Sequence, residues 1–322
     1  MAASDEFAAR RCADVRALWQ ELEHRGPAPS FLARTPTPAL SVARPHECWI
    51  FSVSPRGDVA VGFLTRGRLA RSLQVVLVPE GSEPDALCAG LRRFAKAQRL
   101  SRVTIEGVGA SRAPIPRLEQ ESGRRLQTTW SIDLAACDLD AALSKNHRRN
   151  VRKAVRSGVR CVETTDASAI RDHLRLCGAS LSRRSSRGEA VESRADAALF
   201  RGYLRSHLAT FFQARVAERV LSSDLVVRIG EAAWYTSGGS DPQGMNLGTS
   251  QFLMFELARH LQRAGCATLN LGFSEDPGLD RFKAGFGAQP VPVERVTCEW
   301  GSGWTRWRER AIAALVARLR RR

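Results

Sequence analysis

Hydrophobic and polar residues follow two periods along the chain, one typical of amphipathic helices and one typical of strands. Residues 5–24 carry apolar side chains at helical spacing and predict a first helix. The proline-rich segment 27–45 predicts loop or extended chain. Three runs rich in β-branched and aromatic residues then predict strands at 48–53, 59–65 and 72–78. The chain therefore mixes both kinds of element from its start.

The remainder of the sequence continues this mixture. Helical periodicity predicts helices at 83–98, 139–156, 167–181, 195–208, 250–262 and 278–285. Short apolar runs predict strands at 102–106, 125–134, 159–163, 211–216, 224–229, 232–238, 267–271 and 291–300. The expected fold class is α+β.

Two segments of the chain repeat one pattern. In 91–107 and in 257–272, an amphipathic helix passes through a polar turn into a short strand that ends in glycine. Each copy follows antiparallel strands, and a length of 322 residues suits about two domains of ~150 residues. We therefore expect two tandem α+β domains at 1–135 and 136–302, followed by a basic amphipathic helix at 303–322.

The charge balance points to an anionic partner. Lys and Arg number 49 against 33 Asp and Glu, which gives a net charge of +16. Such a charge suits phosphates, nucleic acid or an acidic lipid surface. Hydrophobic residues at 43% argue against a disordered or collagenous chain. The four lysines, Lys96, Lys145, Lys153 and Lys283, are rare beside the arginines and so more informative.

Cysteine usage and the N-terminus bear on the compartment. The eight cysteines show neither C-x-x-C spacing nor a zinc pattern, which favours free thiols in a reducing cytosol and no metal site. Asp5 and Glu6 argue against a signal peptide, and no apolar run approaches the ~20 residues of a transmembrane helix. We expect a cytoplasmic protein. The basic C-terminal helix leaves open a peripheral contact with the inner, anionic face of a membrane.

The strongest local signal is the basic stretch 143–158, which contains no acidic residue. On a helix its cations form one stripe, and like charges at this spacing repel one another. A helix that tolerates this repulsion typically neutralises an anion, and Arg and Lys are the side chains that bind phosphate. Arg149, Arg152 and Lys153 are therefore candidate phosphate ligands. The alternative is a solvated basic face.

A second signal is the glycine-bearing segment 238–250, which leads directly into a helix. A loop at a helix N-terminus offers free N–H groups to an anion, so Gly248, Thr249 and Ser250 are candidate donor-binding residues. Ser250 fits equally well as a plain helix cap. A third signal, 269–287, combines a strand, an acidic loop, and Phe282 with Lys283. Its alternative interpretation is a helix that buries its phenylalanines and exposes the lysine.

Together these segments resemble the FemAB-like branch of the GNAT acyltransferase superfamily, in order and spacing from about residue 139 to 298. The matching pieces are the basic helix, the strands ending at 234–239, the helix 252–262, Leu-Asn-Leu-Gly at 269–272 and Arg-Phe-Lys-Ala-Gly-Phe-Gly at 281–287. The resemblance implies two tandem GNAT-like domains, each a mixed or antiparallel sheet flanked by helices. The N-terminal domain is expected to be degenerate.

The same resemblance implies transfer of an acyl or aminoacyl group to an amine, with acyl-CoA or aminoacyl-tRNA as co-substrate and no bound cofactor. Acceptors in this branch include cell-wall precursors and sugar or amine groups near polysaccharide metabolism. The chain lacks the inserted coiled-coil arm of some aminoacyl-transferring members. It also lacks the Arg/Gln-x-x-Gly-x-Gly/Ala loop of simple GNAT enzymes. Both donors therefore stay open, with acyl-CoA slightly ahead.

By motif, Lys283 and Phe282 are expected at the donor–acceptor cleft, with Trp234 among the binding residues. GNAT-type chemistry needs an oxyanion donor and a path for the amine proton. A backbone N–H at 233–235 is the expected oxyanion donor, and Lys283 adds positive charge. Glu275, Asp276 and Asp280 are the candidate proton carriers, and Tyr235 is the alternative.

A different class of function also fits the charge. The basic stretch and the basic C-terminal helix suit a non-catalytic module that holds RNA or an anionic membrane. Cations gathered beside the glycine segment and Lys283 indicate a catalytic cleft. Cations spread over all faces indicate a binding surface.

Overall fold

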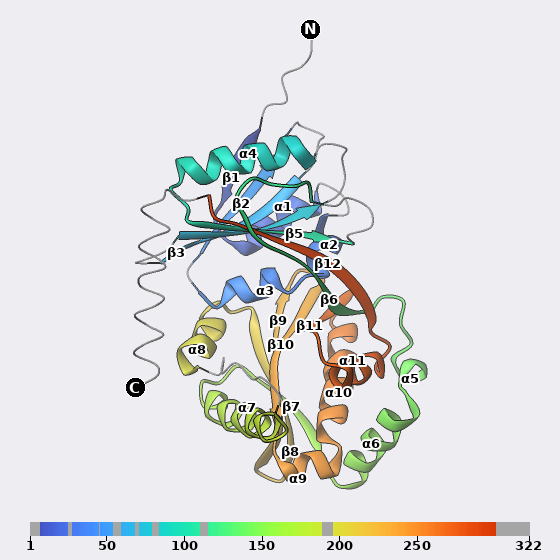
Figure 1. Ribbon diagram of the computed structural model, residues 1–322. Coiled ribbons are helices and arrows are strands. Elements are labelled where there is room, and N and C mark those ends of the chain that lie inside the picture. Colours follow the sequence, from blue (N-terminus) through green and yellow to red (C-terminus); the bar gives the residue numbers. More distant parts are fainter. Residues whose placement is uncertain are drawn as a thin grey trace. The chain divides into compact units, whose positions relative to one another are not determined.

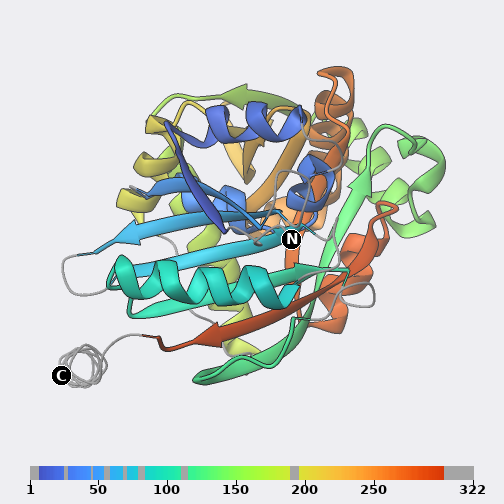
Figure 2. The ribbon, with the colours of Figure 1, turned by 90° about the horizontal axis from the view of Figure 1, so that it is seen from above.

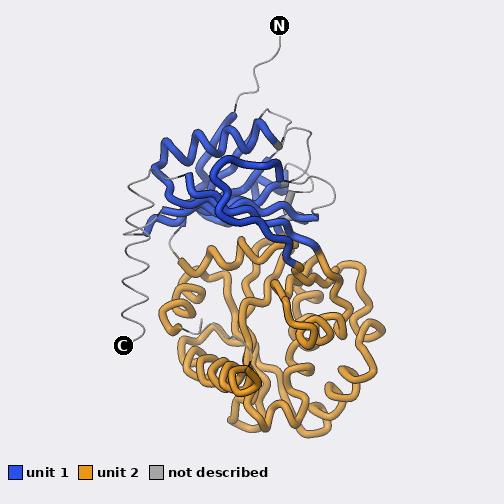
Figure 3. The backbone as a smooth tube through the Cα atoms, in the orientation of Figure 1, with its two compact units in different colours: residues 1–32, 45–127, 292–322 blue, residues 33–44, 128–291 orange. Residues whose placement is uncertain are grey.

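The computed structural model describes residues 7–24, 28–44, 46–53, 59–67, 71–78, 84–109, 115–188 and 196–300 (Figure 1). The chain divides into two compact units, and each is discontinuous in sequence (Figure 3). Unit 1 comprises residues 1–32, 45–127 and 292–322, and unit 2 comprises 33–44 and 128–291. The helix predicted at 303–322 lies outside the described residues. The domain boundaries drawn from the sequence stay a prediction.

The sheet of unit 1 has the strand order β1–β2–β3–β4–β5–β12. Its strands are β1 (Ala8–Cys12), β2 (Glu47–Ser52), β3 (Val59–Arg66), β4 (Arg71–Val78), β5 (Arg102–Val108) and β12 (Gln289–Cys298). The first four are antiparallel, β5 runs parallel to β4, and β12 is antiparallel to β5. Helix α4 (Pro84–Ala97) joins β4 to β5 and runs along the sheet (Figure 2). Its Leu87 and Leu91 pack on the core of this unit.

The sheet of unit 2 has the order β6–β11–β10–β9–β8–β7. Its strands are β6 (Glu121–Asp133), β7 (Arg160–Thr164), β8 (Ala209–Val216), β9 (Arg219–Ile229), β10 (Ala232–Ser240) and β11 (Thr268–Ser274). Helices α9 (Pro242–Leu247) and α10 (Thr249–Arg263) connect β10 to β11, and the apolar side chains of α10 enter the main core of the unit. Helix α7 (Ala169–Ser186) packs against β9 and β10 from the other side (Figure 1).

Both units repeat one topology, which confirms the predicted α+β fold with two tandem copies. In each, an antiparallel meander leads through helix into a strand parallel to the last meander strand: β2–β3–β4–α4–β5 in unit 1, and β8–β9–β10–α9–α10–β11 in unit 2, which has one short helix more. The final strand is exchanged between the copies. β6 follows β5 in sequence but pairs with β11, and β12 follows β11 but pairs with β5. The sequence repeat by itself does not reveal this exchange.

Two predictions near the N-terminus are wrong. Residues 5–24 do not form one helix, because β1 comes first and helix α1 (Val15–Glu23) begins only where the Asp14 side chain accepts a hydrogen bond from Ala17 N at 2.8 Å. The proline-rich segment is not mainly loop, since it holds helices α2 (Ala28–Ala33) and α3 (Thr37–Val42). Proline is tolerated in a first helical turn, where its missing N–H has no partner to lose.

Two predictions in unit 2 also need correction. The single helix expected at 139–156 is two helices, α5 (Leu139–Ala142) and α6 (Lys145–Arg156). They separate because the Ser144 hydroxyl caps α6 by accepting from His147 N at 3.2 Å. The segment 238–250 is not an open loop, since it contains helix α9 (Pro242–Leu247). The remaining helices are α8 (Ala197–Arg205) and α11 (Pro277–Ala284), both near their predicted positions.

Candidate active site

The parallel strands β10 and β11 separate after a short ladder. Only Ala232–Trp234 of β10 pair with Thr268–Asn270 of β11. A β-bulge then follows on each strand, between Tyr235 and Ser237 on β10 and between Asn270 and Phe273 on β11. Bulges bend a strand away from its neighbour. We call the diverging segments 235–240 and 271–274 the strand fork, because their facing edges lack the ladder that joins the strands before them.

A buried histidine anchors the bulge of β10. His173 reaches from α7, is 0% exposed, and bonds Ser223 Oγ and Ser237 Oγ at 2.9 Å each through its two ring nitrogens. Burial lowers the pKa of His173 to about 4, so the ring stays neutral and acts as one donor and one acceptor. The bulged residue Thr236 adds a bond from its hydroxyl to Leu225 O at 3.1 Å. The shape of this arm of the fork is therefore held by side chains.

An asparagine anchors the bulge of β11. The Asn270 side-chain oxygen accepts from Gly272 N at 2.7 Å and from Thr129 Oγ1 at 3.3 Å. The Asn270 amide nitrogen is buried, and within the described residues it has no hydrogen-bond partner. A donor without a partner therefore remains at the point where the strands part.

Lys283 belongs to this second arm. Its side chain is 3% exposed, and its ammonium donates to Gly272 O at 2.8 Å and to Phe273 O at 3.0 Å. Burial lowers the pKa of Lys283 to about 8, while the nearby Asp280 opposes that shift. The interpretation of an exposed lysine on α11 is therefore wrong. The ammonium group is fixed against the bulge of β11.

The phenylalanines of the same motif join α11 to α6. The rings of Phe282 and Phe286 lie 5.3 Å and 4.4 Å from the ring of His147. His147 Nε2 also bonds Phe282 O at 3.0 Å. A Cβ on Gly285 would come within 2.6 Å of the histidine ring, so glycine is required for this approach. Phe282 thus packs in the core and positions the basic helix.

The basic helix lies against the start of α10. A Cβ on Gly248, which begins α10 at φ +76, would come within 2.8 Å of Asn150 O. Arg149, Arg152 and Lys153 are exposed on the same helix as Asn150. The first N–H groups of a helix have no partner within it. Exposed cations and a helix N-terminus therefore occur together here.

The hydroxyls predicted to bind the donor are already paired. Thr249 is buried, and its hydroxyl bonds Ser222 Oγ. Ser250 Oγ bonds Ser240 Oγ at 2.7 Å. These contacts hold the start of α10 on β9 and β10, so the backbone of 248–250 rather than its side chains is left to meet a ligand.

Trp234 and Tyr235, both predicted site residues, are adjacent on β10. Trp234 is 0% exposed, and its indole N–H donates to Thr35 O at 2.8 Å, so its side chain is a core residue. Tyr235 is the first residue of the fork and is half-buried on the side of α10. The tyrosine therefore has the better access to a ligand.

The predicted acids have other partners. Asp276 caps α11 by accepting from Leu279 N at 2.7 Å, and Asp280 accepts from Trp130 Nε1 at 2.9 Å. Glu275 is exposed. The structure instead reveals Asp224 on β9, 7% exposed, which the sequence analysis missed. A lone acid inside a run of buried strand residues, 220–227, is the signal that points to it.

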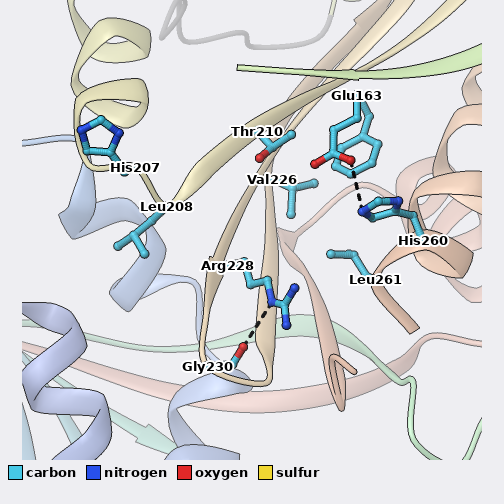
Figure 4. Close-up of a pocket in the computed structure, with 10 residues that line it drawn as sticks. Glu163, His207, Leu208, Thr210, Val226, Arg228, Gly230, His260 and Leu261 are labelled. Atoms are coloured by element: carbon cyan, nitrogen blue, oxygen red, sulfur yellow. Dashed lines mark hydrogen bonds and ion pairs between the residues drawn. The ribbon is translucent and has the colours of Figure 1, made fainter. Parts of the chain in front are cut away.

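A pocket lies elsewhere in unit 2 and contains none of the predicted site residues (Figure 4). It is lined by β7, β8, β9 and the C-terminal end of α10. Its charged groups already pair with protein atoms. His260 lies 3.2 Å from Glu163, and Arg228 donates to Gly230 O and Ala264 O. We therefore take the fork as the candidate site.

Metal-binding clusters and membrane-spanning helices are both absent from the described residues. No cluster of three His, Cys, Asp or Glu side chains suited to a metal ion occurs in that part of the chain. None of the described helices is long and apolar enough to cross a membrane.

Comparison with known proteins matches this part of the chain to a family. Residues 141–284 match the family described as acetyltransferase (GNAT) domain, a range that spans α6, the fork and α11. At the level of sequence, no curated protein matches the chain.

Solved structures share the fold over most of the chain. The crystal structure of FemX is similar with a TM-score of 0.58 at 12% identity, covering 82% of this chain and 90% of that one. The C-terminal domain of a putative lysylphosphatidylglycerol synthetase from Agrobacterium fabrum gives 0.52 at 15% identity, covering 92% and 97%. A tandem GNAT protein from the clavulanic acid biosynthesis pathway gives 0.50 at 14% identity, covering 92% and 100%. These likenesses concern the fold.

Proposed function

Because the chain belongs to the GNAT acyltransferase superfamily through residues 141–284, we propose that it transfers an acyl group from a phosphate-bearing donor to an amine. The favoured donor is acyl-CoA, and the alternative is aminoacyl-tRNA. The observation that carries this proposal is the strand fork, where the ladder between β10 and β11 stops after three residue pairs.

The fork suits an extended donor. Strand edges without a ladder partner offer backbone N–H and C=O groups, and an extended chain with amides of its own satisfies them as an added strand does. The pantetheine arm of CoA is such a chain. The amide nitrogen of Asn270, which has no hydrogen-bond partner in the described part of the chain, offers one further donor where the strands part.

The helices beside the fork suit the phosphates of the donor. The exposed Arg149, Arg152 and Lys153 on α6 supply charge, and the backbone at 248–250 supplies helix N-terminal N–H groups. The same cations suit the backbone of tRNA, which is why that donor stays in the test.

The reaction itself needs no covalent bond between the protein and the acyl group. The amine nitrogen attacks the carbonyl carbon, a C–N bond forms, and the bond to the donor sulfur or oxygen breaks. Negative charge grows on the carbonyl oxygen, where N–H groups at the bulge of β10 stabilise it. The fixed ammonium of Lys283 adds a positive field from the other arm. Tyr235 is the favoured proton carrier, since Asp276 is engaged as a helix cap and Glu275 is exposed.

A ligand panel tests this function. The full chain is heated with CoA, acetyl-CoA, longer acyl-CoAs, aminoacyl-tRNA and uncharged tRNA at low and high salt. A ligand at ~100-fold its Kd stabilises by about 2.7 kcal/mol, which raises Tm by roughly 2–4 °C for a unit of this size. Transfer of labelled acyl groups to amino sugars and peptide amines is measured next.

The expected result is a salt-tolerant shift with an acyl-CoA, followed by transfer. A salt-sensitive shift that is stronger for charged than for uncharged tRNA establishes the alternative donor. An equal, salt-sensitive response to every polyanion, with no transfer, overturns the proposal in favour of a binding module.

A further inference from the structure

Asp224 is a buried acid to which the described residues offer no hydrogen-bond or ion-pair partner. It lies in the middle of β9 and is 7% exposed. Among the described residues, no hydrogen bond or ion pair involves its carboxyl group. A buried charge is normally paired, because water that would solvate it has been removed. An acid kept in this state in a catalytic domain is a candidate for proton chemistry.

The bulge of β10 brings Tyr235 to this acid. Tyr235 and Gly238 are three residues apart, so a regular strand would point them to opposite faces of the sheet. The bulge between Tyr235 and Ser237 inserts one residue and places both on the face of Asp224, which pairs with Gly238 in the register.

The absence of a side chain at Gly238 leaves one small space that both groups border. A Cβ added there would lie 2.1 Å from Asp224 Oδ1 and 2.3 Å from the Tyr235 hydroxyl. Both oxygens therefore occupy the space that any larger residue would fill. Tyr235 also lies at the start of the fork, so it connects the buried acid to the place where the donor is expected.

We propose that Tyr235 and Asp224 form a proton relay for the acyl transfer, with Tyr235 at the substrate and Asp224 acting through it. This inference rests on the proposed function. As the C–N bond forms, the amine proton passes to the Tyr235 oxygen, and the phenol proton passes to the Asp224 carboxylate. When the bond to the donor breaks, the same protons return in reverse order to the leaving sulfur or oxygen. Both Tyr235 and Asp224 then have the protonation states with which they started.

The surroundings of Asp224 allow it to change charge near neutral pH. Burial raises the pKa of Asp224 to about 8, and burial together with this acid raises the pKa of Tyr235 well above its ordinary value. Burial raises the pKa of Cys177 of α7 and of Cys161 of β7 to about 12, and the charge of Asp224 adds to both shifts. Glu256 of α10 lies near Cys161. The tyrosine and both thiols therefore stay neutral where Asp224 titrates.

The test compares wild type with Asp224→Asn, Tyr235→Phe and the double variant. Asp172→Asn, which removes one carboxylate from the surface of α7, is the matched control. A positioned acid–base group contributes about 10²–10⁴-fold, so each single variant is expected to lower kcat/KM by about 100-fold or more. The double variant should be no worse than the worse single variant, because the two groups act as one unit.

The pH profile separates a relay from a structural role. Wild-type kcat/KM should rise through about pH 8, where Asp224 ionises, and Asp224→Asn should remove that rise. The shift in Tm with the best donor should stay unchanged in the variants. A merely structural role would change donor binding and leave the pH profile intact.

Each contrary result has its own meaning. Wild-type activity or a wild-type pH profile in Asp224→Asn overturns the relay alone, as do losses that multiply in the double variant. A wild-type chain that transfers no acyl group from any donor overturns the proposed function, and the relay with it.

Discussion

The ammonium group of Lys283 lies 2.8 Å from the carbonyl oxygen of Gly272, at the bulge of β11. Together with its bond to Phe273 O, this contact places a positive charge beside the fork. It also gives two carbonyl groups of the bulge a hydrogen-bond donor. Lys283→Ala should therefore abolish turnover. The protein should remain folded but lose about 3–6 kcal/mol of stability, because two hydrogen bonds of a charged group are lost and each is worth roughly 1.5–3 kcal/mol.

Turnover with the best donor and the urea midpoint measure the two effects. Lys96→Ala, at an exposed lysine of α4, is the control and should change neither. Full activity in Lys283→Ala would remove this residue from the site.

Gly238→Ala should close the space shared by Asp224 and Tyr235. The added Cβ would meet their oxygens at 2.1 Å and 2.3 Å, so at least one side chain must move. We expect turnover to fall by more than about tenfold, an effect within the range for a displaced acid–base group. Gly178→Ala in α7 is the control, because a Cβ there meets nothing within 4 Å. The control should keep full activity, and a helix gains about 0.5–1 kcal/mol from the change.

Asp224 should make stability depend on pH. Its pKa is about 8 in the fold, against an ordinary value of 3.8, so the folded chain binds the extra proton between these values. Wild type therefore loses stability as pH rises from about 4 to 8, by up to ~1.4 kcal/mol per pH unit.

His173 acts in the opposite direction, because its pKa falls from 6.5 to about 4 and the unfolded chain binds more protons between these values. The difference in the free energy of unfolding between wild type and Asp224→Asn isolates the contribution of this acid, because His173 and the other titrating groups contribute equally to both proteins. Urea unfolding of both at several pH values should show the variant gaining on wild type up to about pH 8. A constant difference would contradict the raised pKa.

The chain should bind one donor. The ladder between β10 and β11 ends after three residue pairs, whereas the equivalent ladder between β4 and β5 in unit 1 runs over six, Ser72–Leu77 with Arg102–Gly107. In unit 1, β4 and β5 therefore pair their backbone groups with each other and leave no open edges between them over this stretch. Calorimetric titration with the best donor should give a stoichiometry of one. Two equal sites would show that the longer ladder does not exclude a donor.

The cations of α6 should control donor affinity. Replacing Arg149 and Lys153 by Glu should weaken donor binding at least about tenfold and reduce the salt dependence by about one unit of slope for each lost phosphate contact. The matched control replaces Arg201 and Arg205 of α8, which are also exposed. Equal effects in both pairs would mean that general charge, and not a site, attracts the donor.

Local sequence patterns predicted most elements of this fold. The strands at 48–53, 59–65 and 72–78 are β2 to β4, and the helix at 250–262 is α10, because burial on one face imposes a period that survives in the sequence. The errors fall where capping overrides periodicity. Asp14 and Ser144 begin helices inside segments whose apolar spacing continues without a break.

The sequence by itself determined the repeated α+β unit, the basic helix and the family resemblance, since these depend on residues close together in the chain. Only the tertiary structure decided that β6 and β12 exchange places, that Lys283 is buried against Gly272, and that Asp224 and Tyr235 border one space at Gly238. Strand pairing joins segments far apart in sequence, and one bulged residue reverses the face that the next side chains occupy. Local periodicity contains neither kind of information.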